Sequence, residues 1–265
     1  MTIITLTTDF GFRDPFVGAL KGVILEINRH VHLVDLTHDI APQDVLEGAL
    51  ALEAAVPFFP PGTVHLAVVD PGVGSPRRGL GVSAGGQLFV GPDNGLFSFL
   101  FAEGAWTARS LEARAYRLPE VSRTFHGRDV FAPAAAHLSR GVPLHRFGPE
   151  VPDPVRLPWP AARREGEALM GEVVHADRFG NLVTSVRAHE LAALGPEASL
   201  VVEVGNAVVV GLSAAYAEHS PGGLGAIVGS SARLELFVRD GSARVHLGVA
   251  RGARVAVRKR GDAGG

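Results

Sequence analysis

The sequence predicts a two-domain α/β protein, in which an N-terminal, mostly parallel sheet flanked by helices precedes a smaller C-terminal antiparallel β-barrel. Three observations support this prediction. In the first half, β-branched apolar runs alternate with helical patterns, which is typical of a parallel sheet. Five prolines between residues 149 and 160 then interrupt any regular pattern. Beyond them, short apolar runs are separated by tight turns, which favours a small barrel or sandwich.

We therefore expect an α/β domain over 1–155, a proline-rich linker over 156–167 and a barrel domain over 168–265. In the first domain, apolar residues repeat at helical spacing after Pro15, a residue that the first turn of a helix accepts. Gly85 and Gly86 separate two short apolar runs as in a hairpin. The expected strands are 3–8, 31–36, 64–69, 80–84 and 87–90, and the expected helices are 16–27, 44–56 and 131–139.

The second domain has a different rhythm, with short strands and tight turns. The pairs Gly205-Asn206 and Asp240-Gly241 stand where hairpin turns are expected. The expected strands are 169–174, 182–186, 200–204, 207–211, 233–238, 244–249 and 254–258.

Composition excludes several classes of protein. The chain has 265 residues, a formal net charge of −2 and no cysteine. It therefore cannot carry a disulfide scaffold, a thiolate nucleophile or a thiolate zinc site. The charge predicts no nucleic-acid partner, and the absence of a long apolar run predicts no membrane partner. The first residues lack the pattern of a signal peptide, so we expect a cytoplasmic protein.

Candidate binding or catalytic residues follow two of the expected parallel strands. Asp9 ends the first strand and Asp70 ends the third, and ligands of open parallel sheets bind at the carboxyl ends of strands. The alternative is that Asp9 and Asp14 cap the next helix and that Asp70 begins an ordinary turn. His126 precedes a helix, where it could act as a base or a ligand.

The glycine-rich loop Gly72-Val73-Gly74 completes neither a phosphate-binding loop nor a dinucleotide fingerprint. On patterns alone, the sequence indicates an acidic ligand site but not a reaction.

Several motifs, taken together and in order, resemble one family over nearly the whole chain. That family is the S-adenosylmethionine hydrolases, or SAM hydroxide adenosyltransferases, which are related to fluorinase and chlorinase. The motifs are Thr7-Thr8-Asp9-Phe10-Gly11 with Asp14, Thr37-His38-Asp39-Ile40, Asp70-Pro71-Gly72-Val73-Gly74 with Arg77, Gly91-Pro92-Asp93-Asn94-Gly95, Thr124-Phe125-His126-Gly127-Arg128-Asp129, Asp177 with Phe179-Gly180-Asn181, and Leu234-Glu235-Leu236.

The resemblance implies that water attacks the ribose C5′ of S-adenosylmethionine and expels methionine, leaving adenosine. The family's activating triad corresponds to Asp70, Arg77 and His126. His126 and Asp70 would position water and accept its proton, while Arg77 would stabilise the developing hydroxide. No metal or organic cofactor is implied.

The resemblance also assigns substrate-binding residues. They are Asp9 for the ribose hydroxyls, Asp14 and Asp177 for the methionine ammonium, Ser230 and Ser231 for its carboxylate, Asn181 with backbone near Val238 and Asp240 for adenine, and Phe125, Phe179 and Tyr216 for apolar or stacking contact. A homotrimer is implied, with each site formed by the first domain of one subunit and the second domain of its neighbour.

The sequence departs from its relatives at four positions. Gly127 and Val73 stand where fluorinase resemblance expects a halide-binding serine and a threonine, which favours hydrolysis over halogenation. Ala232 replaces a usual glycine, and Phe237 replaces a usual small residue.

Three alternative functions stay open from the sequence. A non-catalytic sensor of S-adenosylmethionine or adenosine would not need the three triad residues together. A metal-dependent hydrolase could use Asp9, Asp14, Asp70 and His126 as ligands. A chlorinase would use halide in place of water.

Overall fold

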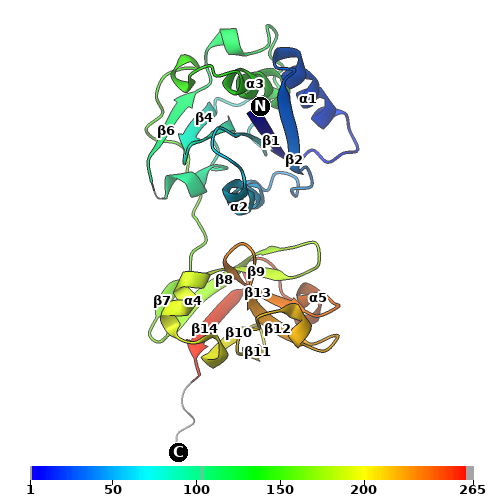
Figure 1. Ribbon diagram of the computed structural model, residues 1–265, viewed down its shortest axis with the longest axis vertical. Coiled ribbons are helices and arrows are strands. Elements are labelled where there is room, and N and C mark those ends of the chain that lie inside the picture. The colour runs from blue at the N-terminus through cyan, green and yellow to red at the C-terminus, as the bar shows by residue number, and fades with distance from the viewer. Residues whose placement is uncertain (1, 103, 261–265) are drawn as a thin grey trace, which may run out of the picture. The chain divides into compact units, whose positions relative to one another are not determined.

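The computed structural model describes residues 2–102 and 104–260, so the last five residues of the expected barrel domain lie outside the described residues. The chain forms two compact units, one ending at Trp159 and the other beginning at Pro160 (Figure 1). Among the described helices, none has the length and apolar character that crossing a membrane requires.

The first unit contains the expected mostly parallel sheet. The strand order is β2-β1-β3-β5-β4-β6. Strands β2, β1, β3 and β5 run parallel, and β4 pairs antiparallel with both of its neighbours, β5 and β6. The strand bounds are β1 (Thr2–Thr8), β2 (Val31–Thr37), β3 (Val64–Val68), β4 (Gly79–Ala84), β5 (Gln87–Pro92) and β6 (Trp106–Ser110). The hairpin of β4 and β5 forms around Gly85-Gly86, as the sequence predicts. Strand β6 is an addition to the expected elements.

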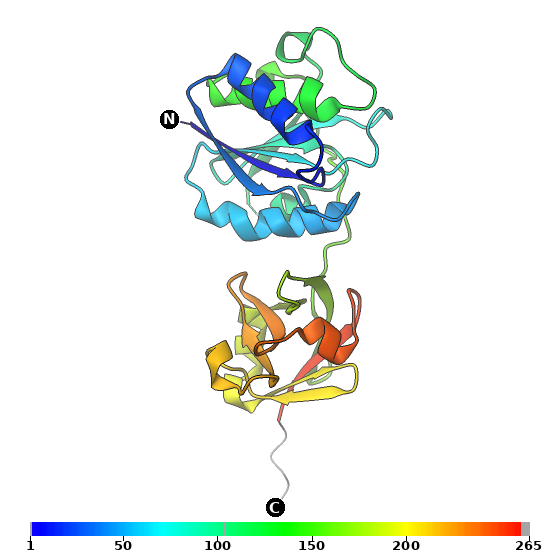
Figure 2. The same cartoon turned by 90° about the vertical axis from the view of Figure 1, so that its right-hand side faces the viewer.

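Helices cover both faces of this sheet. Helices α1 (Phe16–Ile27) and α3 (Ala132–Ser139) lie on one face, and α2 (Val45–Ala55) lies on the other (Figure 2). Leu66 and Val68 belong to the core cluster under α1 and α3, whereas Ala67 belongs to the cluster that contains α2 residues. Burial on both faces fits the composition of β3, in which every residue is buried and only His65 is polar.

The second unit is the expected antiparallel barrel, nearly closed. Its strand order is β11-β10-β14-β8-β9-β13-β12, and β7 pairs with β8. An isolated bridge between Ser213 and Ile227 brings the chain after β11 next to β12. The bounds are β7 (Arg163–Glu165), β8 (Ala168–Ala176), β9 (Leu182–Arg187), β10 (Leu200–Val204), β11 (Ala207–Val210), β12 (Leu224–Val228), β13 (Arg233–Val238) and β14 (Arg254–Lys259).

One expected strand is wrong. The segment 244–249 alternates apolar and polar residues, yet it forms helix α5 (Ala243–Leu247). Ser242 caps this helix by accepting a hydrogen bond from the Val245 amide, and Gly248 ends it in the left-handed conformation. The two caps, with five residues between them, override the short alternation, so Asp240-Gly241 leads into a helix and not into a hairpin. Helix α4 (Ala188–Leu194) and strand β12 are further additions to the expected elements.

Candidate active site

Asp70, Arg77 and His126 form one continuous hydrogen-bonded chain in the first unit. Arg77 donates from Nε to Asp70 Oδ1 at 2.7 Å and pairs through Nη2 with Asp70 Oδ2. The same Nη2 lies 2.9 Å from Nδ1 of His126. The side chains of Arg77 and Asp70 are only 10% and 6% exposed. The sequence places these residues 56 positions apart at most, and the fold brings them into one partly buried cluster.

The loop after β3 carries Asp70 and Arg77. Its turn is closed by the Val73 amide, which donates to the Asp70 carbonyl. At Gly74 the backbone has φ of +80°, and a Cβ atom there would overlap the carbonyl oxygen of Arg123, so only glycine fits this close approach. This loop therefore forms the expected turn and also carries the ion pair between Asp70 and Arg77.

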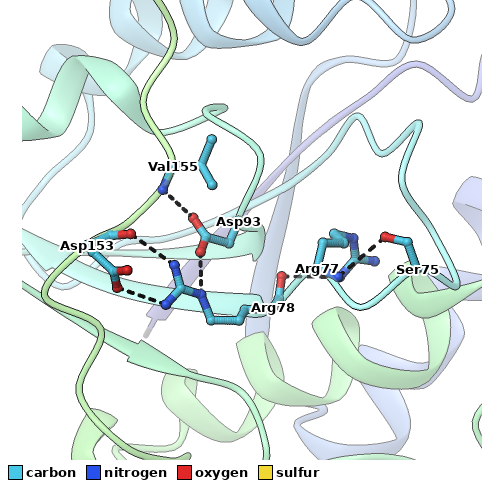
Figure 3. A network of polar contacts seen from close by, with 6 residues as sticks. All are labelled: Ser75, Arg77, Arg78, Asp93, Asp153 and Val155. Atoms are coloured by element: carbon cyan, nitrogen blue, oxygen red, sulfur yellow. Dashed lines mark hydrogen bonds and ion pairs between the residues drawn. The ribbon is translucent and has the colours of Figure 1, made fainter.

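Arg78 anchors the end of that loop next to Arg77. Its guanidinium binds Asp93 at 2.7 Å and Asp153 at 2.9 Å, while Asp93 also accepts from the Val155 amide. Figure 3 shows the two arginine side chains pointing away from each other, with Arg77 Nη1 donating to the Arg78 carbonyl. The Arg78 network thus fixes the backbone from which Arg77 extends.

His126 stands immediately before a single π-helical turn, Gly127–Phe131, which continues into α3. Asp129 in that turn is fully buried and accepts from the Ser122 amide and from Arg128. Arg77 also lies over the ring of Phe131, 5.2 Å from its centroid. Because π-turns are rare and need local support, this buried carboxylate is a structural reason for the position of His126.

Electrostatics favour an uncharged His126. Burial, together with the positive charge of Arg77, lowers the pKa of His126 below its ordinary value. A guanidinium can only donate, so Nδ1 of His126 accepts and the neutral ring carries its proton on Nε2. The free edge of the histidine is therefore a hydrogen-bond donor.

Asp9 and Asp14 do not cap the following helix. Asp9 accepts from the Gln43 amide at 2.8 Å, and α1 has Pro15 at its N-cap position with no side-chain cap. Asp9 follows β1, and Asp70 lies just beyond β3, its parallel neighbour in the sheet. Both carboxylates consequently stand at the same edge of the sheet, as expected. Asp14 is exposed.

Phe125 lies in an aromatic cluster beside this edge. Its ring meets those of Phe10 and Phe16 edge to face at 5.8 and 5.3 Å between centroids. The guanidinium of Arg128 also lies over the Phe125 ring, 5.1 Å from its centroid. This cluster supplies the apolar surface next to His126.

The second unit contains a pocket of about 720 Å³. Seven of the sequence-predicted binding residues line it, namely Asp177, Phe179, Asn181, Tyr216, Ser230, Val238 and Asp240. Ser231 is not among the lining residues, and its Oγ is buried without a hydrogen-bond partner in the described part of the chain.

Hydrogen bonds organise the pocket wall. Asp177 Oδ1 accepts from the Asn181 amide at 2.8 Å, and Oδ2 accepts from Asn181 Nδ2 at 2.9 Å. Tyr216 donates from its hydroxyl to Glu235 at 3.3 Å and meets Phe237 edge to face. Asp177, Asn181 and Tyr216 are thus each held by a neighbour in the same wall.

Sequence reasoning did not assign Glu235, Phe237 or Arg239 to the site, although all three line the pocket. A signal for Glu235 existed, because it is an acidic residue between two leucines in a strand that carries only one other charged residue, Arg233, and every residue of β13 is buried. Phe237 fits because Gly225 lies beneath its ring, where a Cβ atom would be too close. The bulky Phe237 is therefore accommodated by a glycine on the neighbouring strand.

Within residues 2–102 and 104–260, no group of three or more histidine, aspartate or glutamate side chains is arranged so that it could hold a metal ion. The proposed ligand set of Asp9, Asp14, Asp70 and His126 is not such a group. Instead, Arg77 occupies the space between Asp70 and His126.

Comparison with known proteins identifies the family of the chain. Residues 4–148 match the SAM hydroxide adenosyltransferase N-terminal domain, and residues 171–256 match the C-terminal domain of the same family. An (R)-S-adenosyl-L-methionine hydrolase of Salinispora tropica is 42% identical, with 96% of this chain and 97% of the relative covered. The hydrolase of the same name from Thermus thermophilus is 40% identical, with 96% and 99% covered.

Fluorinases are more distant relatives. The fluorinase of Actinopolyspora mzabensis is 29% identical, with 73% of this chain and 74% of the relative covered. Among solved structures, an uncharacterised conserved protein from Thermotoga maritima matches with a TM-score of 0.90 and 33% identity, with 98% of this chain and 100% of that chain covered. With both family domains matched in order, the chain belongs to the SAM hydroxide adenosyltransferase family.

Proposed function

We propose that the protein hydrolyses S-adenosyl-L-methionine to adenosine and L-methionine. The observation that carries this proposal is the chain of hydrogen bonds from Asp70 through Arg77 to His126 at one edge of the sheet. The names of the hydrolases that are 40% and 42% identical over nearly the whole chain support the same substrate. Their names also specify the R configuration at sulfur, which we propose for this substrate.

In the proposed reaction, a water oxygen forms a bond to C5′ of the ribose, and the bond from C5′ to sulfur breaks with both electrons moving to sulfur. The leaving group is a neutral thioether, so it needs no proton from the protein. The water must lose a proton, because neutral water is a poor nucleophile. Catalysis therefore depends on groups that hold and deprotonate one water molecule.

The triad geometry supports separate roles for its members. His126 presents an Nε2–H donor that can hold the water oxygen, since its Nδ1 already accepts from Arg77. Asp70 is then the proton acceptor, because each carboxylate oxygen has lone pairs beyond those used by Arg77. Arg77 stabilises the negative charge that develops on the water oxygen.

Gly127 favours water over halide as the nucleophile. It follows His126 directly and offers no hydroxyl, whereas fluorinase resemblance expects a serine there. A Cβ atom at Gly127 would meet Phe125 and Phe10 at 3.4 and 3.5 Å, which is ordinary contact. The absence of a side chain here is thus not forced by packing.

We also propose that the functional unit is a homotrimer, in which the triad of one subunit and the pocket of its neighbour act on one substrate molecule. Asp9 and Asp14 would contribute from the first unit, and the pocket residues from the second. Light scattering on the purified chain should give three times its 27.8 kDa mass. At a substrate concentration well below KM, where both variants are slow, a mixture of His126→Ala and Asn181→Ala subunits should exceed the summed activity of the two separate variants, because mixed trimers contain intact composite sites. A fully active monomer would contradict the arrangement.

The decisive experiment incubates chelator-treated protein with each sulfur epimer of S-adenosyl-L-methionine and follows adenosine and methionine by chromatography. Equal amounts of both products from the R epimer, lost in His126→Ala, are expected. Binding without turnover would favour a sensor. Loss of activity on chelation, restored by a divalent metal, would favour the metal-dependent mechanism, and 5′-chloroadenosine formed with chloride would favour the chlorinase.

A further inference from the structure

Glu235 is a buried carboxylate in the wall of the pocket in the second unit. It lies on β13, is 7% exposed and lines the same pocket as Asp177. The Tyr216 hydroxyl is its hydrogen-bond partner, through Oε2, and no other partner is found among the described residues. A carboxylate has about four acceptor positions, so most of the acceptor capacity of Glu235 is unused.

Asp177 differs from Glu235 in this respect. Both of its carboxylate oxygens already accept from Asn181, one from the amide and one from the side chain. Asp177 thus shapes the turn after β8, whereas Glu235 keeps an acceptor available. A buried carboxylate with few partners is costly, so it suggests a missing ligand.

The charge of the pocket favours a cation. Asp177, Glu235 and Asp240 line it, and Arg239 is the lining residue of opposite charge. The guanidinium of Arg239 donates hydrogen bonds to the backbone carbonyls of Ala217 and His219, which hold it in place. The carboxylates are therefore only partly neutralised.

The neighbours of Glu235 narrow the chemistry of that cation. Gly229 lies directly against the carboxylate, since a Cβ atom there would overlap Oε1. The next residue, Ser230, lines the pocket with a hydroxyl donor. An α-amino acid carries its ammonium and its carboxylate on one carbon, so a site for it needs an acceptor and donors side by side. Glu235 and the serine loop offer this combination.

We propose that Glu235 binds the α-ammonium of the amino-acid end of the substrate, with the hydroxyl of Ser230 in the same pocket as a donor for the neighbouring carboxylate. This inference rests on the proposed function for the identity of the substrate. It makes Glu235 a specificity residue that selects a substrate with a free amino group, alongside Asp177. Burial raises the pKa of Glu235, and so does the charge of Asp177, so a bound cation would stabilise its ionised form.

The test compares Glu235→Gln with wild type on two substrates: S-adenosyl-L-methionine and an analogue in which hydrogen replaces the α-amino group. With the natural substrate, KM should rise about 10- to 100-fold, the loss expected when a hydrogen bond to a charged group is removed. With the deaminated analogue, the variant and wild type should differ by less than about twofold. The kcat should change little with either substrate.

Two further variants act as controls. Glu203→Gln removes a carboxylate on β10 that pairs with Arg258 at the barrel surface, and it should leave KM unchanged. Gly229→Ala keeps Glu235 but displaces its carboxylate, and it should reproduce the selective rise in KM. Melting temperatures of all variants establish that they are folded.

Several results would overturn the inference. An unchanged KM for Glu235→Gln on the natural substrate would do so. An equal rise in KM on both substrates would also overturn it. So would a rise in KM that disappears when oxygen replaces the adenine amino group, since the carboxylate would then bind the base. If wild type hydrolyses nothing, the proposed function fails. The inference is then tested by calorimetry with L-methionine, which wild type should bind more tightly than Glu235→Gln.

Discussion

The proposed reaction centre in the first unit and the pocket in the second unit use ionisable side chains in opposite ways. Asp70, Arg77 and His126 bind one another, so their positions are set before any ligand arrives. In the pocket, Glu235 keeps unused acceptor capacity around an open volume of about 720 Å³. Mutual pairing suits a centre that must orient one small molecule, whereas unpaired capacity suits recognition of a large ligand.

The two regions nevertheless share one electrostatic property. Burial is the first cause of the lowered pKa of His126 and of the raised pKa of Glu235. Both shifts favour the uncharged form of the side chain. They differ in consequence, because neutral His126 is the form we propose for catalysis, whereas binding a cation requires ionised Glu235.

The largest effect is expected from His126→Ala. Loss of the Nε2–H donor should lower kcat about 10²- to 10³-fold, the range usual when one positioned hydrogen-bond donor at a reacting oxygen is removed. KM should change less than about threefold, because the pocket is untouched. Steady-state formation of adenosine measures both constants. His145→Ala removes an exposed histidine of the same unit as a control, and equal kcat values in the two variants would refute the role of His126.

The pH dependence should separate the two regions. Protonation of His126 would remove its acceptor for Arg77, so kcat should fall about tenfold per pH unit below the pKa of His126. Because that pKa lies below the ordinary histidine value of about 6.5, kcat at pH 6.5 should stay above half of its plateau value and reach half only in more acidic solution. A kcat that is already halved at pH 6.5 would show that another group controls turnover.

KM should respond to the pocket. The raised pKa of Glu235 means that its carboxylate becomes protonated at a higher pH than an ordinary glutamate, so KM should rise as the solution is acidified. In Glu235→Gln this acid rise in KM should be weaker. Equal profiles in the two proteins would assign the rise to another carboxylate, such as Asp9.

Much of this comparison could be predicted from the sequence, because the relevant signals are local. The carboxyl ends of β1 and β3 indicated Asp9 and Asp70, and the motif around His126 supplied the third group. Arg77 was reached only through the family resemblance, since no local pattern shows that a loop arginine returns to an aspartate seven residues earlier. The structure shows the return, because the turn that the Val73 amide closes onto the Asp70 carbonyl lies between the two residues, and Arg77 Nε donates to Asp70 Oδ1.

The failures have physical causes as well. The alternation of apolar and polar residues in 244–249 predicts a strand. The segment is helical because the caps Ser242 and Gly248 stabilise a short helix more than this alternation favours a strand. The sequence does not indicate that Glu235 lines the pocket, because the role of a buried carboxylate on a strand depends on its spatial neighbours. One of these is Tyr216, which is 19 residues away in the sequence. Contacts of this kind depend on register and cannot be obtained from spacing.

A smaller effect is expected from Asn181→Ala in the pocket. The variant removes one partner of Asp177 and the amide that we propose for adenine recognition. KM should rise about tenfold, consistent with one or two hydrogen bonds, while kcat changes less than about threefold. Asn206→Ala, in the exposed turn between β10 and β11, is the matched control. A fall in kcat with constant KM would contradict the assignment of substrate binding to the second unit and of turnover to the first.

The smallest effect concerns the loop that carries the serines. Ala232 has φ of +55°, a conformation that costs a residue with a side chain about 1–2 kcal/mol relative to its preferred state. Ala232→Gly relieves this strain but gives the unfolded chain more freedom, so a net gain of about 0.5–1 kcal/mol in the free energy of unfolding is expected. Calorimetry should show a melting temperature higher by about 1–3 °C.

Ala192→Gly in α4 is the matched control and should be destabilising by up to about 1 kcal/mol, because its backbone is helical. The two variants also probe whether strain at Ala232 serves binding. Its side chain is exposed and does not line the pocket, so Ala232→Gly changes only the backbone freedom beside Ser231. Increased stability with unchanged KM would mean that the strain is incidental. Increased stability with a higher KM would mean that a strained loop holds the serines ready for the substrate, extending to the pocket the preorganisation seen at the triad.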